Sequence, residues 1–159
     1  LFSSNLWYII EIVPKSSGKY LIIFSSALEL KINNEKMKNL IIDATSDKII
    51  LKIINLKESY TRDYINSREN FDRLTKLIFE FLDQNNINIT EINNIFINQG
   101  PGKFSSIRTS IAIAKALSFS NKIDLYGFNS DQVKEQNYNK IIDLYEKGEL
   151  KKDLIKPQY

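Results

Sequence analysis

The sequence predicts an α/β fold in which helices cover a mixed β-sheet, and three observations support this prediction. Residues 38–65 contain apolar runs separated by short polar turns, a pattern typical of antiparallel strands. Two longer stretches, residues 67–85 and 105–121, repeat apolar residues at three- and four-residue spacing, as amphipathic helices do. After residue 85, short apolar strands alternate with helical segments, which favours parallel strands joined by helical crossovers.

Three strands are expected before the first helix. Residues 38–45 carry a continuous apolar run, which suits a strand buried on both faces. Residues 49–54 follow a polar turn and are expected to form a hairpin with the first strand. The more polar residues 60–65 supply a third strand. The sheet therefore begins with an antiparallel group.

The first helix is expected over residues 67–85, with Ser67 at its N-cap. A brief turn at residues 90–92 leads to a strand over residues 95–99. The glycine loop Gly100–Phe104 then opens the helix over residues 105–121, and the strand over 125–128 completes a strand-helix-strand unit whose two strands are parallel.

Ser130 is expected to cap a last helix that continues to about Tyr145, followed by Gly148 and a lysine-rich tail. Together these elements describe a ribonuclease-H-like fold, the first lobe of an actin-like ATPase. Its mixed sheet is expected to have about five strands with helices packed on it.

The composition excludes several kinds of chemistry. The chain has 159 residues, which suits one domain or one domain with a short appendage. It contains no cysteine and no histidine, so these residues form no disulfide, no thiolate or histidine metal site and no histidine-dependent catalytic group. Neither a metal nor a cofactor is expected.

Charge and hydropathy indicate a soluble, cytoplasmic protein with no membrane partner. The net charge of +3 is spread along the chain, so nucleic-acid binding by the chain alone is not expected. No apolar run approaches the roughly 20 residues that a membrane helix needs.

The beginning of the chain allows two interpretations. Residue 1 is Leu, and the only methionine is Met37, directly before the first predicted strand. Met37 is either the true initiator, with residues 1–36 an upstream extension, or residues 1–36 form an appended hairpin whose turn is Pro14–Gly18. The expected division is therefore 1–36, 37–130 for the lobe, and 131–159 for a C-terminal helix and tail. Mass spectrometry of the native N-terminus would separate the two interpretations.

Two segments combine the groups that bind phosphate. The loop Gly100–Gly102 precedes a helix, where free backbone amides favour an anion, although its spacing is not that of a Walker loop. Asp43 and Thr45 end the first strand, as do residues near Mg²⁺ and phosphate in actin-like ATPases. A tight turn and an Asx turn are the structural alternatives. Since only 29 residues follow Ser130 (159 minus 130), no second lobe is available and ATP turnover by this chain alone is not expected.

Residues 37–130 resemble the bacterial tRNA threonylcarbamoyladenosine biosynthesis family known as TsaB, YeaZ or Gcp-like (M22 glycoprotease-like) proteins. The resemblance lies in KNLIIDATSDKIIL, RENFDRLTKLIFEFL and INQGPGKFSSIRTSIAIAKALSFSNKIDLYGFNS. The family motifs IDTST, GxGPGSFTGLRIG, AKGLA and GVSSL correspond to residues 42–46, 99–110, 114–117 and 127–130. Asn70 stands where a histidine is usual, and the glycine-loop helix departs from the family at Lys103, Ser106, Thr109 and Ser110. Most of the family's second lobe has no counterpart here.

The resemblance implies a non-catalytic partner of the transferase TsaD, in a system with the ATPase TsaE that places a threonylcarbamoyl group on adenosine 37 of tRNAs reading ANN codons. TsaD has the same fold, but its metal site uses histidines, which this sequence lacks. The tRNA would be reached only through the complex. A homodimer is the alternative association.

The family dimerises through its first lobe, so the resemblance also implies that helices 67–85 and 105–121 form the pairing surface. The candidate contacts are Phe71, Leu74, Arg108, Ile111 and Lys115. Two other interpretations stay open. One is a decayed fragment without function. The other is a small nucleotide- or phosphate-binding enzyme of the actin-like ATPase superfamily that uses Asp43, Thr45, Gly100 and Gly102.

Overall fold

The computed structural model describes residues 10–14, 20–24, 37–55, 57–152 and 155–159, with side chains from residue 37 onward. The chain forms two compact units, Leu1–Lys36 and Met37–Tyr159. In the first unit, β1 (Ile10–Pro14) pairs antiparallel with β2 (Tyr20–Phe24). Residues 15–18 of the predicted turn lie outside the described residues, as do residues 1–9 and 25–36 of the predicted extension.

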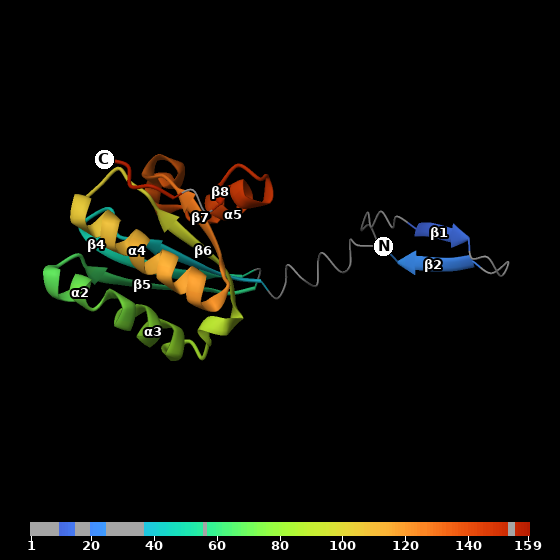
Figure 1. Ribbon diagram of the computed structural model, residues 1–159, viewed down its shortest axis with the longest axis horizontal. Helices are drawn as coiled ribbons and strands as arrows, with labels where there is room; N and C mark the ends of the chain where they lie inside the picture. The colour runs from blue at the N-terminus through green and yellow to red at the C-terminus, as the bar shows by residue number, and fades with distance from the viewer. Residues whose placement is uncertain (1–9, 15–19, 25–36, 56, 153–154) are drawn as a thin grey trace, which may run out of the picture. The chain divides into compact units, whose positions relative to one another are not determined.

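The second unit is built on a six-stranded sheet with the order β5-β4-β3-β6-β7-β8 (Figure 1). The first three strands are antiparallel neighbours, β6 and β7 run parallel to β3, and β8 returns antiparallel to β7. The predicted ribonuclease-H-like, actin-like arrangement is therefore present, with one strand more than expected. The strands are β3 (Lys38–Asp43), β4 (Lys48–Ile54), β5 (Ser59–Ile65), β6 (Ile92–Asn98), β7 (Asp124–Phe128) and β8 (Lys151–Lys152).

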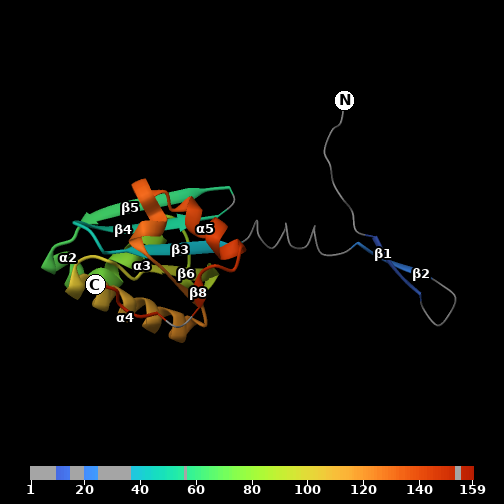
Figure 2. The ribbon, with the colours of Figure 1, turned by 90° about the horizontal axis from the view of Figure 1, so that it is seen from above.

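Helices cover both faces of this sheet, as the apolar run of β3 predicts. Leu40 and Ile42 face one core, which is completed by α3 (Leu74–Gln84) and α4 (Phe104–Asn121). Ile41 faces the other core, where the 3-10 segment η2 (Ser130–Gln136) and α5 (Asn139–Glu146) pack. Figure 2 shows α4 and α5 on opposite sides of the sheet. In the described part of the chain, no helix combines the length and apolar character needed to cross a membrane.

The helix predicted over residues 67–85 is divided in two, so that part of the prediction is wrong. Ser67 does cap it, because its Oγ accepts a hydrogen bond from the Asn70 backbone N at 3.3 Å. However, α2 (Arg68–Asp72) ends at Arg73, whose φ of −103° and ψ of 8° are not helical, and α3 begins afterwards. The apolar spacing continues across the break, so periodicity alone does not reveal it. The turn predicted near residue 90 is present as η1 (Ile89–Glu91).

The last predicted helix, from Ser130 to Tyr145, is also interrupted. The backbone is non-helical over residues 133–135, and the N-cap position belongs to Asn129, not Ser130. Val133 and Tyr138 are both buried against the same sheet face. Residues five apart in a regular helix point in widely different directions, so the interruption allows both side chains to reach the core.

Candidate functional site

A buried hydrogen-bonded cluster surrounds Asp43, at the carboxyl end of β3. Its Oδ1 accepts from the backbone N of Thr45 at 3.0 Å and from the Thr45 hydroxyl at 2.7 Å. Its Oδ2 accepts from Asn98 Nδ2 at 2.9 Å and from the Tyr138 hydroxyl, also at 2.9 Å. The carboxylate, only 6% exposed, thus accepts four hydrogen bonds from three parts of the chain.

Asn98 connects this cluster to the glycine loop. It ends β6 and is fully buried, and its Oδ1 accepts from the Gly100 backbone N at 3.0 Å. Its Nδ2 also lies 3.2 Å from Ser130 Oγ, which in turn donates to the Pro101 carbonyl at 3.1 Å. Asn98 and Tyr138 were not among the predicted site residues. The one sequence signal for Asn98 is its polar side chain directly after the apolar residues 95–97 of β6.

The two glycines of the loop are required by close packing. A Cβ on Gly102 would lie 2.3 Å from the Thr45 carbonyl oxygen, and the neighbouring Lys103 backbone N donates to that same oxygen at 3.1 Å. Gly100 has a φ of +114°, and a Cβ there would lie 2.1 Å from the Gln158 carbonyl oxygen. The loop therefore packs against the turn after β3 and against the C-terminal tail.

The structure thus brings together Asp43, Thr45, Gly100 and Gly102. However, the hydrogen bonds described above join their polar groups to other groups of the protein. Burial and the nearby Asp43 carboxylate hold the pKa of the Tyr138 hydroxyl well above its usual range, so this group remains a hydrogen-bond donor. Two cavities, of about 220 and 300 Å³, are lined by none of the four predicted phosphate residues, although Tyr138 lines the larger of the two. Among the residues with described positions, no group of three acidic side chains is placed to hold a metal ion.

The five predicted partner contacts divide between the core and the surface. Leu74 and Ile111 are core residues, at 0% and 4% exposure, so they pack α3 and α4 against the sheet and are not on the surface. Phe71 is partly buried against the same core, while Arg108 and Lys115 are exposed on α4.

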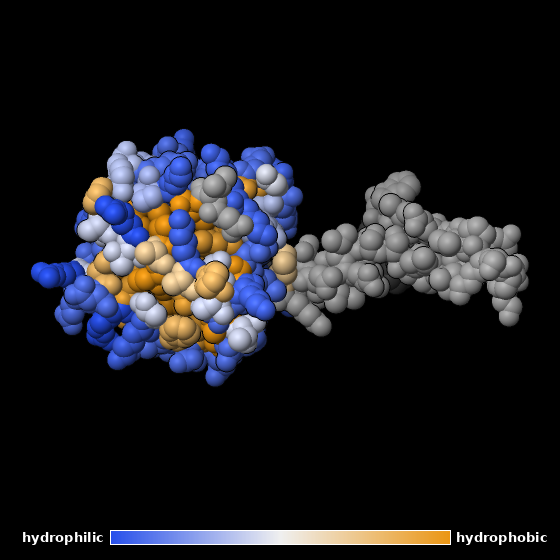
Figure 3. Space-filling view, viewed as in Figure 1, coloured by the Kyte–Doolittle hydropathy of each residue, from blue (hydrophilic) through white to orange (hydrophobic). Residues whose placement is uncertain are grey.

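Three exposed phenylalanines on α3 and α4 were missed by the sequence analysis. Phe119 and Phe104 on α4 are 91% and 55% exposed, and Phe79 on α3 is 37% exposed. At the start of α4, Arg108 lies over the Phe104 ring, 5.2 Å from its centre, and this ring stacks on Tyr159. Figure 3 shows hydrophobic surface gathered over α4 on this face.

Sequence comparison places this chain beside proteins of tRNA modification. Residues 61–138 match the family described as TsaD, tRNA N6-adenosine threonylcarbamoyltransferase. The tRNA threonylcarbamoyladenosine biosynthesis protein TsaB of Buchnera aphidicola subsp. Schizaphis graminum is 31% identical over 91 residues, 57% of this chain and 43% of that protein. The tRNA N6-adenosine threonylcarbamoyltransferase of Fervidobacterium nodosum is 37% identical over 65 residues, 41% of this chain and 19% of that protein. The chain therefore spans less than half the length of either relative.

The fold also has a counterpart of known structure. YeaZ from Pseudomonas aeruginosa superimposes with a TM-score of 0.59 at 17% sequence identity, covering 70% of this chain and 50% of that one. At this identity the likeness concerns the fold, and it agrees with the mixed sheet and its helices described above.

Proposed function

From the premise that the chain is TsaB/YeaZ-like in sequence and fold, we propose that it serves tRNA threonylcarbamoyladenosine modification as a non-catalytic partner of a TsaD-like transferase. The observation that carries the proposal is the 31% identity with a TsaB over 91 residues. The match to the TsaD family over residues 61–138 supports the same modification pathway.

Two features support a partner role instead of catalysis. These residues contain no histidine, so they cannot supply the histidine metal site that the resemblance assigns to TsaD. The Asp43 carboxylate is enclosed by Thr45, Asn98 and Tyr138, so a nucleotide or Mg²⁺ could reach it only by displacing internal hydrogen bonds. The proposal includes a TsaE-like ATPase in the same system and tRNA contact only through the complex.

The outer surfaces of α3 and α4 are the proposed contact region. Phe119 and Phe79 are exposed aromatic side chains on the helices that the family resemblance assigns to pairing, and aromatic residues are enriched at protein interfaces. Arg108 and Lys115 are exposed cationic residues on α4. Arginine is also enriched at protein interfaces.

The decisive experiment is to mix the purified full chain with the TsaD-like transferase of the same organism. We expect co-elution from a sizing column at micromolar concentration and an increase in threonylcarbamoyl transfer to tRNA over the transferase alone. Separate elution at that concentration, or ATP hydrolysis by the isolated chain, would overturn the proposal.

A matched pair of variants tests the contact surface. Phe119→Ser should weaken the complex at least tenfold, because the most exposed aromatic ring on α4 is removed. Ile65→Ser is the control, since Ile65 is also an exposed apolar residue, at 74%, but lies on β5. Equal affinity of both variants would place the contact elsewhere.

A further inference from the structure

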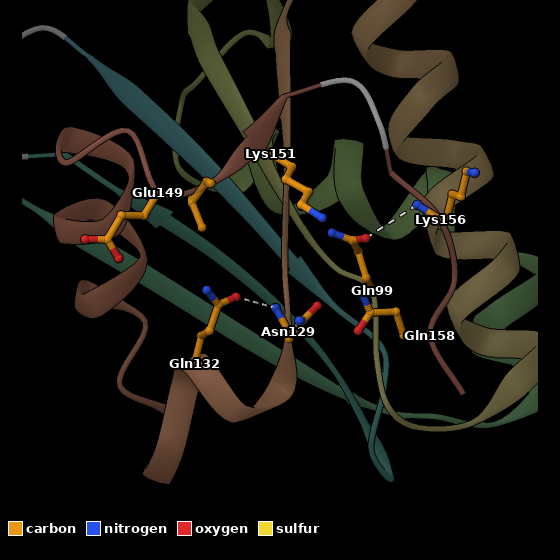
Figure 4. A pocket seen from close by; sticks show the side chains of 9 residues that line it. Gln99, Asn129, Gln132, Glu149, Lys151, Lys156 and Gln158 are labelled. Atoms are coloured by element: carbon orange, nitrogen blue, oxygen red, sulfur yellow. Dashed lines mark hydrogen bonds between the residues drawn. The ribbon is translucent and has the colours of Figure 1, made fainter.

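A polar cavity of about 220 Å³ lies at the carboxyl ends of β6 and β7, apart from the Asp43 cluster (Figure 4). Gln99 directly follows β6, Asn129 directly follows β7, and the C-terminal tail supplies Lys156 and Gln158. The carboxyl ends of parallel strands are where open α/β sheets bind ligands. The volume is below the roughly 300–1,000 Å³ of pockets for drug-sized molecules, so only a small ligand fits.

The side-chain amide of Gln99 is buried but incompletely bonded. Gln99 is 5% exposed, and its Oε1 accepts from the Lys156 backbone N at 3.4 Å. Its Nε2 has no hydrogen-bond partner among the described residues. Every fully enclosed side-chain nitrogen or oxygen of the described residues does have a partner, so Nε2 is not fully enclosed. The Nε2 group therefore reaches the cavity, and Figure 4 shows it directed toward Lys151. A nearly buried amide donor facing a cavity needs an acceptor.

The backbone is shaped to hold this amide in place. Gln99 lies across Gly127 in β7, and a Cβ on Gly127 would lie 1.8 Å from Gln99 Nε2. Gln99 is also fixed by its main chain, since its N donates to the Phe128 carbonyl at 2.8 Å and its carbonyl accepts from the Gln158 N at 2.7 Å. The donor is thus positioned by β7 and the tail together.

Lysine and amide side chains supply further donors around the cavity. Lys151 and Lys156 have no ion-pair partner among the described residues, and in Figure 4 the Lys151 ammonium lies next to Gln99 whereas that of Lys156 points away from it. Gln132 uses its Oε1 to accept from the Asn129 N at 2.7 Å, which leaves its amide nitrogen as a donor. The one acidic residue of the lining, Glu149, points away from Gln99 in Figure 4.

We propose that this cavity binds a small oxyanion, the carboxylate or phosphate group of a small molecule, with Gln99 Nε2 and Lys151 as its principal ligands. An amide N–H and an ammonium group are complementary to such oxygens, and a charge-assisted hydrogen bond is stronger than a neutral one. The proposal is independent of the transferase partnership, because the cavity is lined by different elements from the exposed surfaces of α3 and α4.

The test is a titration of the full chain, labelled with ¹⁵N, with inorganic phosphate in one arm and succinate in the other. We expect saturable shifts of the Gln99 side-chain amide signal in at least one arm, and the tighter arm identifies the ligand group. Lys151→Gln should weaken that binding at least tenfold. Lys115→Gln, the same change on α4, should leave it unaltered.

A second variant addresses the buried amide directly. Gln99→Met keeps the length of the side chain but removes the donor, and it should abolish saturable binding while the backbone amide spectrum stays native. If Gln99→Met fails to fold, the Lys151→Gln comparison decides. The proposal is overturned if neither ligand shifts the Gln99 amide, or if Lys115→Gln weakens binding as much as Lys151→Gln does.

Discussion

At the scale of single residues, the Asp43 cluster stabilises the lobe by satisfying a buried charge. Four donors surround the carboxylate, and one of them, Tyr138, lies 95 positions away in the sequence. Removal of one donor leaves a buried acceptor without a hydrogen bond. The loss of stability then exceeds the net contribution of the hydrogen bond, because the acceptor has also lost its hydration. The cluster therefore ties the C-terminal segment to the strand that begins the sheet.

Tyr138→Phe should lower the free energy of unfolding by about 1–3 kcal/mol, since it removes one donor to a buried carboxylate and keeps the ring. Urea denaturation of both proteins measures the difference. Tyr60→Phe is the control, because the Tyr60 hydroxyl donates to Glu58 in an exposed hydrogen bond and should leave the stability essentially unchanged. Equal effects of the two substitutions would mean that the Asp43 contact contributes nothing.

The raised pKa of Tyr138 predicts a dependence on pH. The unfolded chain ionises this tyrosine near its ordinary pKa of about 10, whereas the folded chain keeps it protonated to higher pH. The stability that its hydroxyl contributes is therefore complete below about pH 10 and is lost as the pH rises above it. The difference in unfolding free energy between wild type and Tyr138→Phe should shrink between pH 9 and 11, and a constant difference would contradict this.

At the scale of elements, the stability of the short helix α2 depends on the cap at its N-terminus. Ser67 caps α2 with a weak hydrogen bond of 3.3 Å, and α2 is short and buries no side chain fully. A short helix without buried residues depends strongly on its cap.

Ser67→Ala should therefore destabilise the protein by about 1 kcal/mol, and Ser67→Asp should retain most of the stability because aspartate also accepts the hydrogen bond. Thermal unfolding measures the change. Ser105→Ala, a substitution of an exposed serine in the first turn of α4, is the matched control and should have little effect. A similar loss from Ser105→Ala would contradict a specific capping role.

The elements that the sequence predicted well are those whose signal is local. The strands β3 and β4 and the helix α4 follow from apolar runs and periodic spacing, and each was predicted to within a few residues. The break at Arg73 was missed because apolar spacing continues across it. The interruption in η2 was also missed, although Val133 and Tyr138 are five residues apart and so depart from helical spacing. The strand β8 has only two lysines and pairs with β7 through backbone hydrogen bonds, for which side-chain pattern gives no sign.

The candidate sites were predicted only in part, for a related reason. Asp43 and the glycine loop were found because their residue types suggest anion chemistry by themselves. Asn98 and Tyr138 became visible only when distant segments were brought together, and Leu74 and Ile111 were assigned to a surface although the sheet buries them. The Gln99 cavity depends on the C-terminal tail crossing the strand ends, which no local pattern encodes.

At the scale of the whole molecule, the C-terminal segment completes the lobe. Ile41, Phe96 and Phe128 line the second sheet face, and the residues that cover them come from η2 and α5. Tyr145 meets the Phe96 ring edge-on at 5.5 Å, and Tyr138 meets Phe128 in the same way at 6.3 Å. Without this cover, one side of a sheet rich in isoleucine and phenylalanine would face water.

Removal of residues 131–159 should therefore abolish cooperative folding, whereas removal of residues 1–36, a separate compact unit, should leave it intact. Burial of the second face supplies apolar stabilisation that the first core cannot replace, and the shortened sheet should behave as a loosely packed state with retained far-UV but lost near-UV circular dichroism. Guanidinium unfolding of both shortened chains provides the measurement. A cooperative transition with an unchanged m-value after removal of 131–159 would show that the lobe is stable without its C-terminal cover.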